Sequence, residues 1–253
     1  MSTAIAGDLE SEAAARVRPV EADLRRYSGE VWRIVEGQHR ISTNRLAADA
    51  AAQARLEELV DDVKPSLPPE AAHLHFLLAA PFRYWHANGT RFRRGGIKPG
   101  IFYASESEAT ALAETAYWRL RFFAASPEIK LPLGNLPHTA FTVAVRTARA
   151  LDLTVPPLNE NRADWTDAGD YASCQKLGDD ARALSTQAIR YESLRDLDGG
   201  ANIAVMTPNA LRGAPNIRTT WHLRVDKDGL TAHPAFPDQA ARRFSTFQFE
   251  GRQ

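Results

Sequence analysis

The chain contains 253 residues, which is enough for one large domain with a sizeable buried core. Its 31 lysines and arginines balance its 31 aspartates and glutamates, so the formal net charge is zero and does not indicate a nucleic-acid-binding protein. Any site for an anion must therefore depend on local charge. Only five of the basic residues are lysines; arginine suits bidentate phosphate contacts, although codon usage is the simpler explanation of this bias.

The single cysteine, Cys174, excludes an internal disulfide and any metal site built from several cysteines. Cys174 could act as a nucleophile, but the segment Ala172–Leu177 is typical of a buried helical turn, which favours a structural thiol. No apolar run is as long as a membrane span, and the N-terminus lacks the basic-then-apolar order of a secretion signal. We therefore expect a cytoplasmic protein that does not bind membranes.

The first part of the chain predicts an appendage followed by the main domain. Residues 1–30 are expected to form a helical appendage, with one amphipathic helix from Leu9 to about Arg26. The aromatic and β-branched segment Val31–Val35 suits a strand. We place the start of a single domain, residues 31–253, at this strand.

A helical insertion is expected at about residues 44–80. Ser42 or Thr43 could cap a helix that continues to about Val63, and the prolines of the segment Lys64–Pro69 would end it.

An arginine-rich loop with flanking glycines, Gly89–Gly96, follows a second helix that is expected from Ala71 to Leu78. Arg83 and Arg91 could bind a pyrophosphate, and aromatic neighbours such as Tyr84 could stack on a base. The alternative is a solvated turn beside an aromatic corner of the core, with arginines that extend outward. The residues of this segment alone leave both interpretations open.

A short strand, Ile101–Tyr103, precedes a helix that should end at about Ala124. Ser105 and Glu108 have the spacing of a capping box at the start of this helix. Glu114 lies on the flank of the predicted apolar stripe, at the border of the core. A surface glutamate is the ordinary interpretation of such a position, so a functional role needs further support.

The second half of the chain predicts further strands and helices. Alternating or β-branched segments indicate strands, glycine pairs indicate turns, and Asp170 could cap a helix. The expected elements are a strand Thr139–Val145, a helix Asp170–Leu184, strands Ala188–Glu192 and Asn202–Met206, and a C-terminal β-hairpin at about 219–233.

Several common enzyme classes find no support in the sequence. The seven histidines show no His-Glu-x-x-His spacing, and neither a Gly-x-Ser-x-Gly segment nor a phosphate-binding loop pattern occurs. His73 and His75 lie too close together on a predicted helix to share a metal from one face. We expect no metal cofactor.

Three later segments favour a functional interpretation of the arginine-rich loop. They are Tyr171-Ala172-Ser173-Cys174-Gln175, Ile189-Arg190-Tyr191-Glu192-Ser193-Leu194-Arg195-Asp196 and Gly199-Gly200-Ala201-Asn202-Ile203-Ala204-Val205. With the spacing from Tyr103 to Glu114, they resemble the RES domain family over roughly Trp32–Met206. Members of that family are toxins of bacterial toxin–antitoxin pairs that consume NAD. The resemblance implies an α/β (α+β) fold similar to ADP-ribosyltransferases, with a mixed central sheet and flanking helices.

The resemblance also implies roles for polar residues that are far apart in the sequence. Glu114 would bind a ribose hydroxyl and stabilise the positive charge that develops on the sugar. Ser193 would bond the nicotinamide amide or the ribose, and Asn202 would support the site.

On the same resemblance, Arg83 and Arg91 would clamp the phosphates of NAD. Tyr84 and Tyr103 would stack against or orient the nicotinamide riboside. The family's defining arginine could be Arg33, Arg83 or Arg91.

The partners implied by the resemblance are a DNA-binding antitoxin that covers the pocket, a second copy of the chain within a toxin–antitoxin complex, and a protein that accepts ADP-ribose. Transfer to phosphate or to water is the alternative chemistry. An inactive fold that serves as the partner of an antitoxin and a nucleotide sensor without turnover are the alternatives of other classes. No direct contact with nucleic acid is expected.

Overall fold

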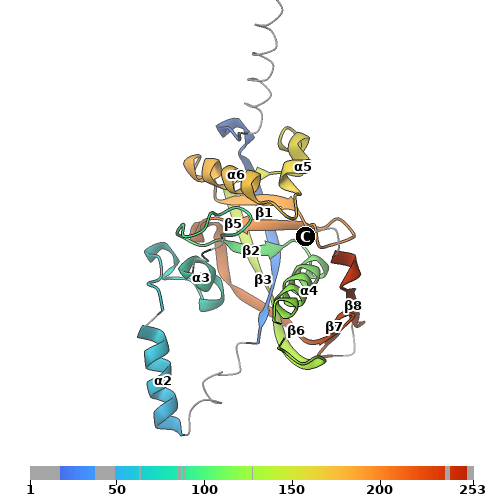
Figure 1. Ribbon diagram of the computed structural model, residues 1–253. Coiled ribbons are helices and arrows are strands. Elements are labelled where there is room, and N and C mark those ends of the chain that lie inside the picture. Colours follow the sequence, from blue (N-terminus) through green and yellow to red (C-terminus); the bar gives the residue numbers. More distant parts are fainter. Residues whose placement is uncertain are drawn as a thin grey trace, which may run out of the picture.

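A computed structural model describes residues 18–37, 49–62, 64–84, 87, 89–126, 128–236 and 240–249 (Figure 1). The helices and strands are β1 Arg25–Glu36, α2 Ala50–Asp62, α3 Phe76–Arg83, β2 Phe102–Ser105, α4 Glu108–Ala124, β3 Leu133–Asp152, α5 Arg162–Trp165, α6 Ala172–Ala183, β4 Ala188–Glu192, β5 Ala201–Val205, β6 Leu211–Asp226, β7 Gly229–Pro234 and β8 Arg242–Ser245. None of the helices in these ranges is long and apolar enough to span a membrane. The predicted mixed α/β fold, with a central sheet and flanking helices, is confirmed.

One eight-stranded sheet organises the molecule, in the order β1-β2-β5-β4-β3-β6-β7-β8. Strand β3 also pairs with β1, so β1, β2, β5, β4 and β3 form a closed ring. The pairing of β3 with β4 is parallel and the other pairings are antiparallel. This closure depends on the length of β3, whose 20 residues are enough to pair with β1 and β4 within the ring and also with β6 outside it.

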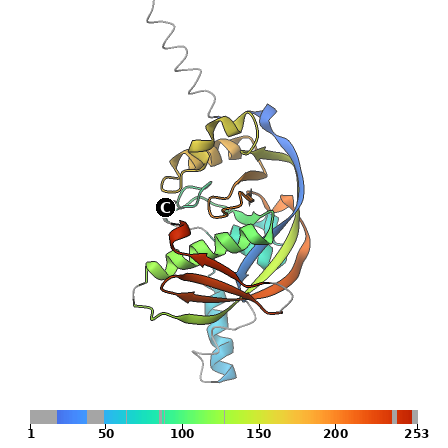
Figure 2. The ribbon, with the colours of Figure 1, turned by 90° about the vertical axis from the view of Figure 1, so that its right-hand side faces the viewer.

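The helices cover different parts of this sheet. Figures 1 and 2 show α5 and α6 together at one end of the molecule, while α4 runs alongside the outer strands β7 and β8. Buried apolar side chains of α4, including Leu112 and Tyr117, pack with Trp221 of β6 in one core cluster. A second cluster joins Leu177 of α6 to Ile189 of β4. Helices α4 and α6 thus pack on different strands of the sheet, each through its own core cluster.

Local sequence signals predicted several elements well. The strand Ala188–Glu192 has the expected bounds. The C-terminal hairpin is confirmed as the pairing of β6 with β7, in which Asp226 faces Gly229 across a two-residue turn. Strand β3 is much longer than the expected segment Thr139–Val145 because it continues through Pro137, which lies opposite His222 in the ladder with β6.

The predicted helix from Leu9 to Arg26 is wrong for the part that the structure describes. After Arg18 the chain forms a single 3₁₀ turn, Glu21–Asp23, and then enters β1 at Arg25. The rest of that prediction lies outside the described residues. The expected domain boundary at residue 30 falls inside β1, whose pairing with β3 makes it part of the central sheet.

The helical insertion also differs from its prediction. The caps proposed at Ser42 and Thr43 lie outside the described residues, and the described helix there is α2. The helix expected from Ala71 to Leu78 begins only at Phe76. Residues 69–71 form a 3₁₀ turn that starts with a proline, and α3 then continues through Pro81 to Arg83.

Helix α4 begins two residues later than the capping-box pattern predicts. Ser107, not Ser105, caps it, because the Ser107 hydroxyl accepts a hydrogen bond from the amide of Thr110 over 3.1 Å. Ser105 is instead the last residue of β2 and is buried. Thr110, in the first turn of the helix, is fully buried.

Candidate functional site

A cleft of about 730 Å³ lies between α4, the ends of the ring strands and the arginine-rich loop. This volume is typical of sites for small molecules, which are roughly 300–1,000 Å³. Its lining combines charged, aromatic and amide side chains. The polar and aromatic residues that line it include Trp32, Arg33, Glu36, Thr90, Arg91, Tyr103, Ser105, Glu114, Trp118, Arg119, Phe122, His138, Tyr171, Tyr191, Glu192, Arg195 and Asn202.

Glu114 stands half-buried on the face of α4 that lines the cleft. Its Oε1 atom accepts hydrogen bonds from the Ser193 hydroxyl and from the Asn202 amide nitrogen, each over 2.7 Å. Among the described residues, none donates a hydrogen bond to Oε2. The structure thus brings together three of the residues predicted for the site and leaves one carboxylate oxygen for a ligand.

Ser105 determines which way the Asn202 amide points. The Ser105 hydroxyl donates a 2.6 Å hydrogen bond to Oδ1 of Asn202, so the amide nitrogen faces Glu114. Both residues are buried, and they lie opposite each other in the pairing of β2 with β5. Sequence reasoning assigned Ser105 to helix capping and missed this contact, since only the register of two strands that are distant in sequence creates it.

The donor and acceptor positions of the Ser193 hydroxyl are all occupied by other residues of the protein. It donates to Glu114 and accepts hydrogen bonds from the amides of Arg195 and Asp196, each over 3.2 Å. A hydroxyl has one proton and two acceptor positions. In this arrangement Ser193 can orient Glu114 but has no capacity left for nicotinamide or ribose, which was its expected role.

Arg91 lines the cleft at the end formed by the arginine-rich loop. Its Nη1 atom donates to the carbonyl of Trp165 over 2.8 Å, and its guanidinium group lies 4.6 Å from the centre of the Tyr171 ring. No carboxylate of a described residue forms a salt bridge with it. Its positive charge therefore remains available to an anion in the cleft.

Tyr103 holds the arginine-rich loop. Its hydroxyl donates to Oγ1 of Thr90 over 2.8 Å and accepts from the amide of Phe92 over 3.3 Å. Burial raises the pKa of this phenol, which stays neutral. Tyr103 lines the cleft as predicted, but its hydroxyl is engaged in fixing the backbone on either side of Arg91.

Arg33, on β1, is a second guanidinium group in the cleft. It donates from Nη1 to the carbonyl of Tyr103 over 2.5 Å and lies 4.9 Å from the centre of the Phe102 ring. Its buried Nε atom has no partner among the described residues. Burial lowers the pKa of Arg33 to about 10, so it is still protonated at neutral pH. A partly buried cation that has no carboxylate partner among the described residues is well suited to an anionic ligand.

Arg83 and Tyr84 do not line this cleft. Arg83 is on the last turn of α3, next to the core residue Phe82, and lines a separate hollow of about 410 Å³ with Lys98 and Thr207. Tyr84 is exposed and lines neither hollow. The expected pairing of Arg83 with Arg91 is thus not formed, because α3 extends further than the sequence indicated. Of the three arginines left open by the sequence, the structure places Arg33 and Arg91 at the cleft.

The opposite end of the cleft has an apolar rim and a buried histidine. Trp118 and Phe122 lie one turn apart on α4 and are 51% and 55% exposed. His138 accepts from Nε of Arg119 over 3.1 Å and contacts the carbonyl of Leu136 through Nδ1 over 2.9 Å. Burial lowers the pKa of His138. The four-residue spacing of Trp118 and Phe122 can be read from the sequence. The sequence prediction missed it because it considered only the apolar stripe of the same helix.

The charge of the cleft is locally positive although the chain is neutral. Four arginines line it, against three glutamates. Two of these glutamates are held in salt bridges, since Glu36 pairs with Arg119 over 2.7 Å and Glu192 pairs with Arg162 over 2.6 Å. The described part of the chain contains no cluster of three histidine, cysteine or acidic side chains that could hold a metal ion. An anion with stackable rings fits this lining best.

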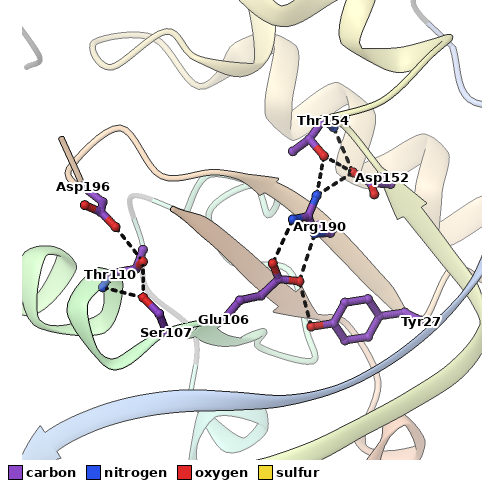
Figure 3. A network of polar contacts seen from close by, with 8 residues as sticks. All are labelled: Tyr27, Glu106, Ser107, Thr110, Asp152, Thr154, Arg190 and Asp196. Carbon is purple, nitrogen blue, oxygen red and sulfur yellow. Dashed lines mark hydrogen bonds and ion pairs between the residues drawn. The ribbon is translucent and has the colours of Figure 1, made fainter. Parts of the chain in front are cut away.

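A network behind the cleft fixes the strands that carry these residues (Figure 3). Glu106, which directly follows Ser105, accepts from Arg190 of β4 over 2.8 and 2.9 Å and from the hydroxyl of Tyr27 of β1 over 3.1 Å. Arg190 also contacts Asp152 and Thr154 at the end of β3. Burial raises the pKa of Tyr27, so the phenol remains a donor. The network ties β1, β3 and β4 to the end of β2.

Comparisons with known proteins identify the family of this chain. Residues 67–226, which are more than half of the chain, match the family model of the RES domain. Among solved structures, the chain is similar to one from the crystal structure of the M. tuberculosis MbcT–MbcA toxin–antitoxin complex. The similarity covers 84% of this chain and 90% of that chain at 19% identity, with a TM-score of 0.47. No curated protein matches the sequence. The family model covers Arg91, Glu114, Ser193 and Asn202, and the chain belongs to the RES domain family.

Proposed function

We propose that the protein is the toxin of a toxin–antitoxin pair and that it cleaves NAD at the bond between nicotinamide and ribose. ADP-ribose would then pass to an acceptor, for which we propose a side chain of a host protein. Membership of the RES domain family supports this assignment, together with the chemistry of the cleft. No metal ion is required in this proposal, and NAD acts as the substrate.

The observation that carries the proposal is the one-sided fixation of Glu114. Ser193 and Asn202 both bind Oε1, which leaves Oε2 for the ligand in a cleft that also contains Arg33 and Arg91. Loss of nicotinamide leaves a ribose ring with oxocarbenium character, which an ionised carboxylate stabilises electrostatically. A glutamate held by two donors from one side loses little freedom when it meets that charge.

The two arginines fit the diphosphate of a dinucleotide. Neither Arg33 nor Arg91 forms a salt bridge with a described carboxylate, and a guanidinium group binds phosphate oxygens through paired N–H donors. The ring of Tyr171 stacks with Arg91, and Trp118 and Phe122 offer aromatic faces at the other end. These features support a ligand that has two rings joined by a charged linker.

The apolar rim also supports an antitoxin as partner. Trp118 and Phe122 are more than half exposed and border the mouth of the cleft. A partner that covers them would bury apolar surface and block access to Glu114 in one step. An acidic or polar segment of such a partner would reach Arg33 and Arg91.

Incubation of the purified protein with NAD tests the proposal. Wild type should release nicotinamide, and Glu114→Gln should reduce the rate by about a thousandfold while it preserves the fold. Glu58→Gln on α2 is a matched control, because Glu58 is exposed and its salt-bridge partner among the described residues is Arg55 on the same helix. Failure of wild type to release nicotinamide, with NAD recovered intact, would contradict the proposal.

Mass spectrometry of the products identifies the acceptor. The reaction is run with labelled NAD in buffer, with phosphate and with cell lysate. A labelled protein band in the lysate alone is the expected result. ADP-ribose 1″-phosphate or free ADP-ribose would instead show transfer to phosphate or to water.

A further inference from the structure

The loop between β4 and β5, residues 193–200, is fastened to α4 at two points. The first is the hydrogen bond from Ser193 to Glu114. The second joins Thr110 to Asp196: Oγ1 of Thr110 lies 2.7 Å from Oδ2 of Asp196. Thr110 and Glu114 are four residues apart and so lie on one face of the helix, one turn from each other. The loop is therefore held against α4 over a full turn.

The second attachment is oriented by its own partners (Figure 3). The Thr110 hydroxyl also lies 2.7 Å from the Ser107 hydroxyl, and Thr110 is fully buried. A carboxylate only accepts, so Thr110 gives its single proton to Asp196 and accepts from Ser107. The other oxygen of Asp196 accepts from the amide of Asp198 over 3.1 Å. The Asp196 side chain is thus fixed on both of its oxygens.

Gly200 leaves the space in which this contact forms. A Cβ atom at this position would lie 2.1 Å from Oγ1 of Thr110 and 2.4 Å from Oδ2 of Asp196. Gly200 also accepts the amide of Ser193 through its carbonyl over 2.8 Å. Any larger residue would separate the two side chains that connect the loop to α4.

The loop determines how Ser193 uses its hydroxyl. The amides of Arg195 and Asp196 occupy both acceptor positions of the Ser193 oxygen, so its proton can only point toward Glu114. Asp196 therefore fixes the Ser193 hydroxyl in two ways. Its backbone amide donates to the hydroxyl oxygen, and its side chain binds Thr110 and so holds the loop in place. Release of Asp196 would free Ser193 to rotate away.

We propose that Thr110 and Asp196, with Gly200 providing the room, are positioning residues for Glu114. They touch no substrate. They keep two backbone amides on Ser193, which keeps the Ser193 proton on Oε1 of Glu114 and Oε2 directed at the ligand. The inference rests on the proposed function only for its kinetic consequences, because the arrangement of the loop can be measured without turnover.

The kinetic test uses Thr110→Val, which keeps the shape of the side chain and removes the hydroxyl. We expect kcat for nicotinamide release to fall by about ten- to a hundredfold with KM for NAD nearly unchanged, since substrate contacts are intact and only the geometry of the carboxylate is lost. Thr110→Ser restores the hydroxyl and should restore kcat. Gly200→Ala should reproduce the loss from the other side of the contact. Thr231→Val is the matched control, because its hydroxyl binds Arg243 on the outer strands, away from the cleft.

A second measurement separates this inference from the proposed function. Hydrogen exchange of the amides of Arg195 and Asp196 should be slow in wild type and in Thr110→Ser and at least about tenfold faster in Thr110→Val. Unchanged exchange in Thr110→Val would overturn the inference, as would unchanged kcat in an active enzyme or an equal rise in KM. If wild type releases no nicotinamide, the proposed function fails, and the exchange rates alone decide the positioning role.

Discussion

Asn202 donates a hydrogen bond from Nδ2 to Oε1 of Glu114 over 2.7 Å, although the two residues are 88 positions apart in the chain. The contact joins strand β5 of the ring to helix α4. Its direction is fixed by Ser105, which occupies Oδ1 of the same amide. Asn202 therefore donates to the Glu114 carboxylate. Its amide group cannot flip to present its oxygen to Glu114 instead.

Asn202→Asp should convert this donor into a second carboxylate beside Glu114. Two carboxylates that share a site cannot both ionise easily, so one pKa of the pair rises. We expect the acidic limb of the pH–rate profile for nicotinamide release to move to higher pH, with kcat at pH 7 lower by about a hundredfold. Asn202→Ala, which removes the donor without adding charge, should lower kcat with no such move. An identical acidic limb in Asn202→Asp and wild type would refute this role.

Arginine variants should separate the cleft from the neighbouring hollow. Arg33→Gln and Arg91→Gln should each raise KM for NAD by at least about tenfold, because each loses charged hydrogen bonds to phosphate. Arg83→Gln should leave KM unchanged, since Arg83 lines the other hollow. Steady-state kinetics of the three variants provide the measurement. A rise in KM for Arg83→Gln alone would show that the substrate lies elsewhere.

The network around Glu106 should contribute to stability more than a surface ion pair does. Arg190→Gln removes the two charged hydrogen bonds to Glu106, a pair that is less than one third exposed. We expect a loss of about 2 kcal/mol in the free energy of unfolding, measured by urea denaturation. Arg243→Gln is the matched control, because Arg243 also forms a bidentate pair, with Asp226, but its side chain is 42% exposed against 28% for Arg190, so the pair should contribute less than about 1 kcal/mol. Equal losses in the two variants would contradict this ranking.

His138 should make stability depend on pH. Burial lowers its pKa below the ordinary value of 6.5, so the unfolded chain binds a proton more readily than the folded protein does. The contribution of neutral His138 is fully present above pH 6.5 and is lost as the pH falls toward the lowered pKa. The melting temperature of wild type should thus drop between pH 7.5 and pH 5.5 by more than that of His138→Gln. A difference between the two proteins that is independent of pH would exclude this linkage.

The parts of the fold that depend on neighbouring residues could be predicted from the sequence. The strand Ala188–Glu192 and the hairpin turn before Gly229 have bounds set by local composition. The closed ring could not be predicted, because it requires β3 to pair with β1 along residues 138–150 and with β4 at residues 150–152. No local pattern encodes how far a strand continues when distant partners extend it.

The candidate site likewise has a part that could be predicted from the sequence and a part that could not. Glu114, Ser193 and Asn202 were grouped through the family resemblance, and the structure brings them into contact. The role of Ser105 was missed because either Ser105 or Ser107 could cap α4. The pairing of β2 with β5 places Ser105 in the sheet, and Ser107 caps the helix. Arg83 was misplaced because its sequence neighbours suggested an open loop where α3 continues.

The order in which the ring strands occur has a consequence for protein synthesis. A ribosome releases Arg33, Arg91 and Glu114 well before it releases Ser193 and Asn202, and β5 is the last strand that the ring needs. A nascent chain that ends between Glu114 and Ser193 carries the charged residues but neither donor for the glutamate. Premature termination before Asn202 would thus yield a product in which the ring lacks its last strand and Glu114 lacks the amide that holds it.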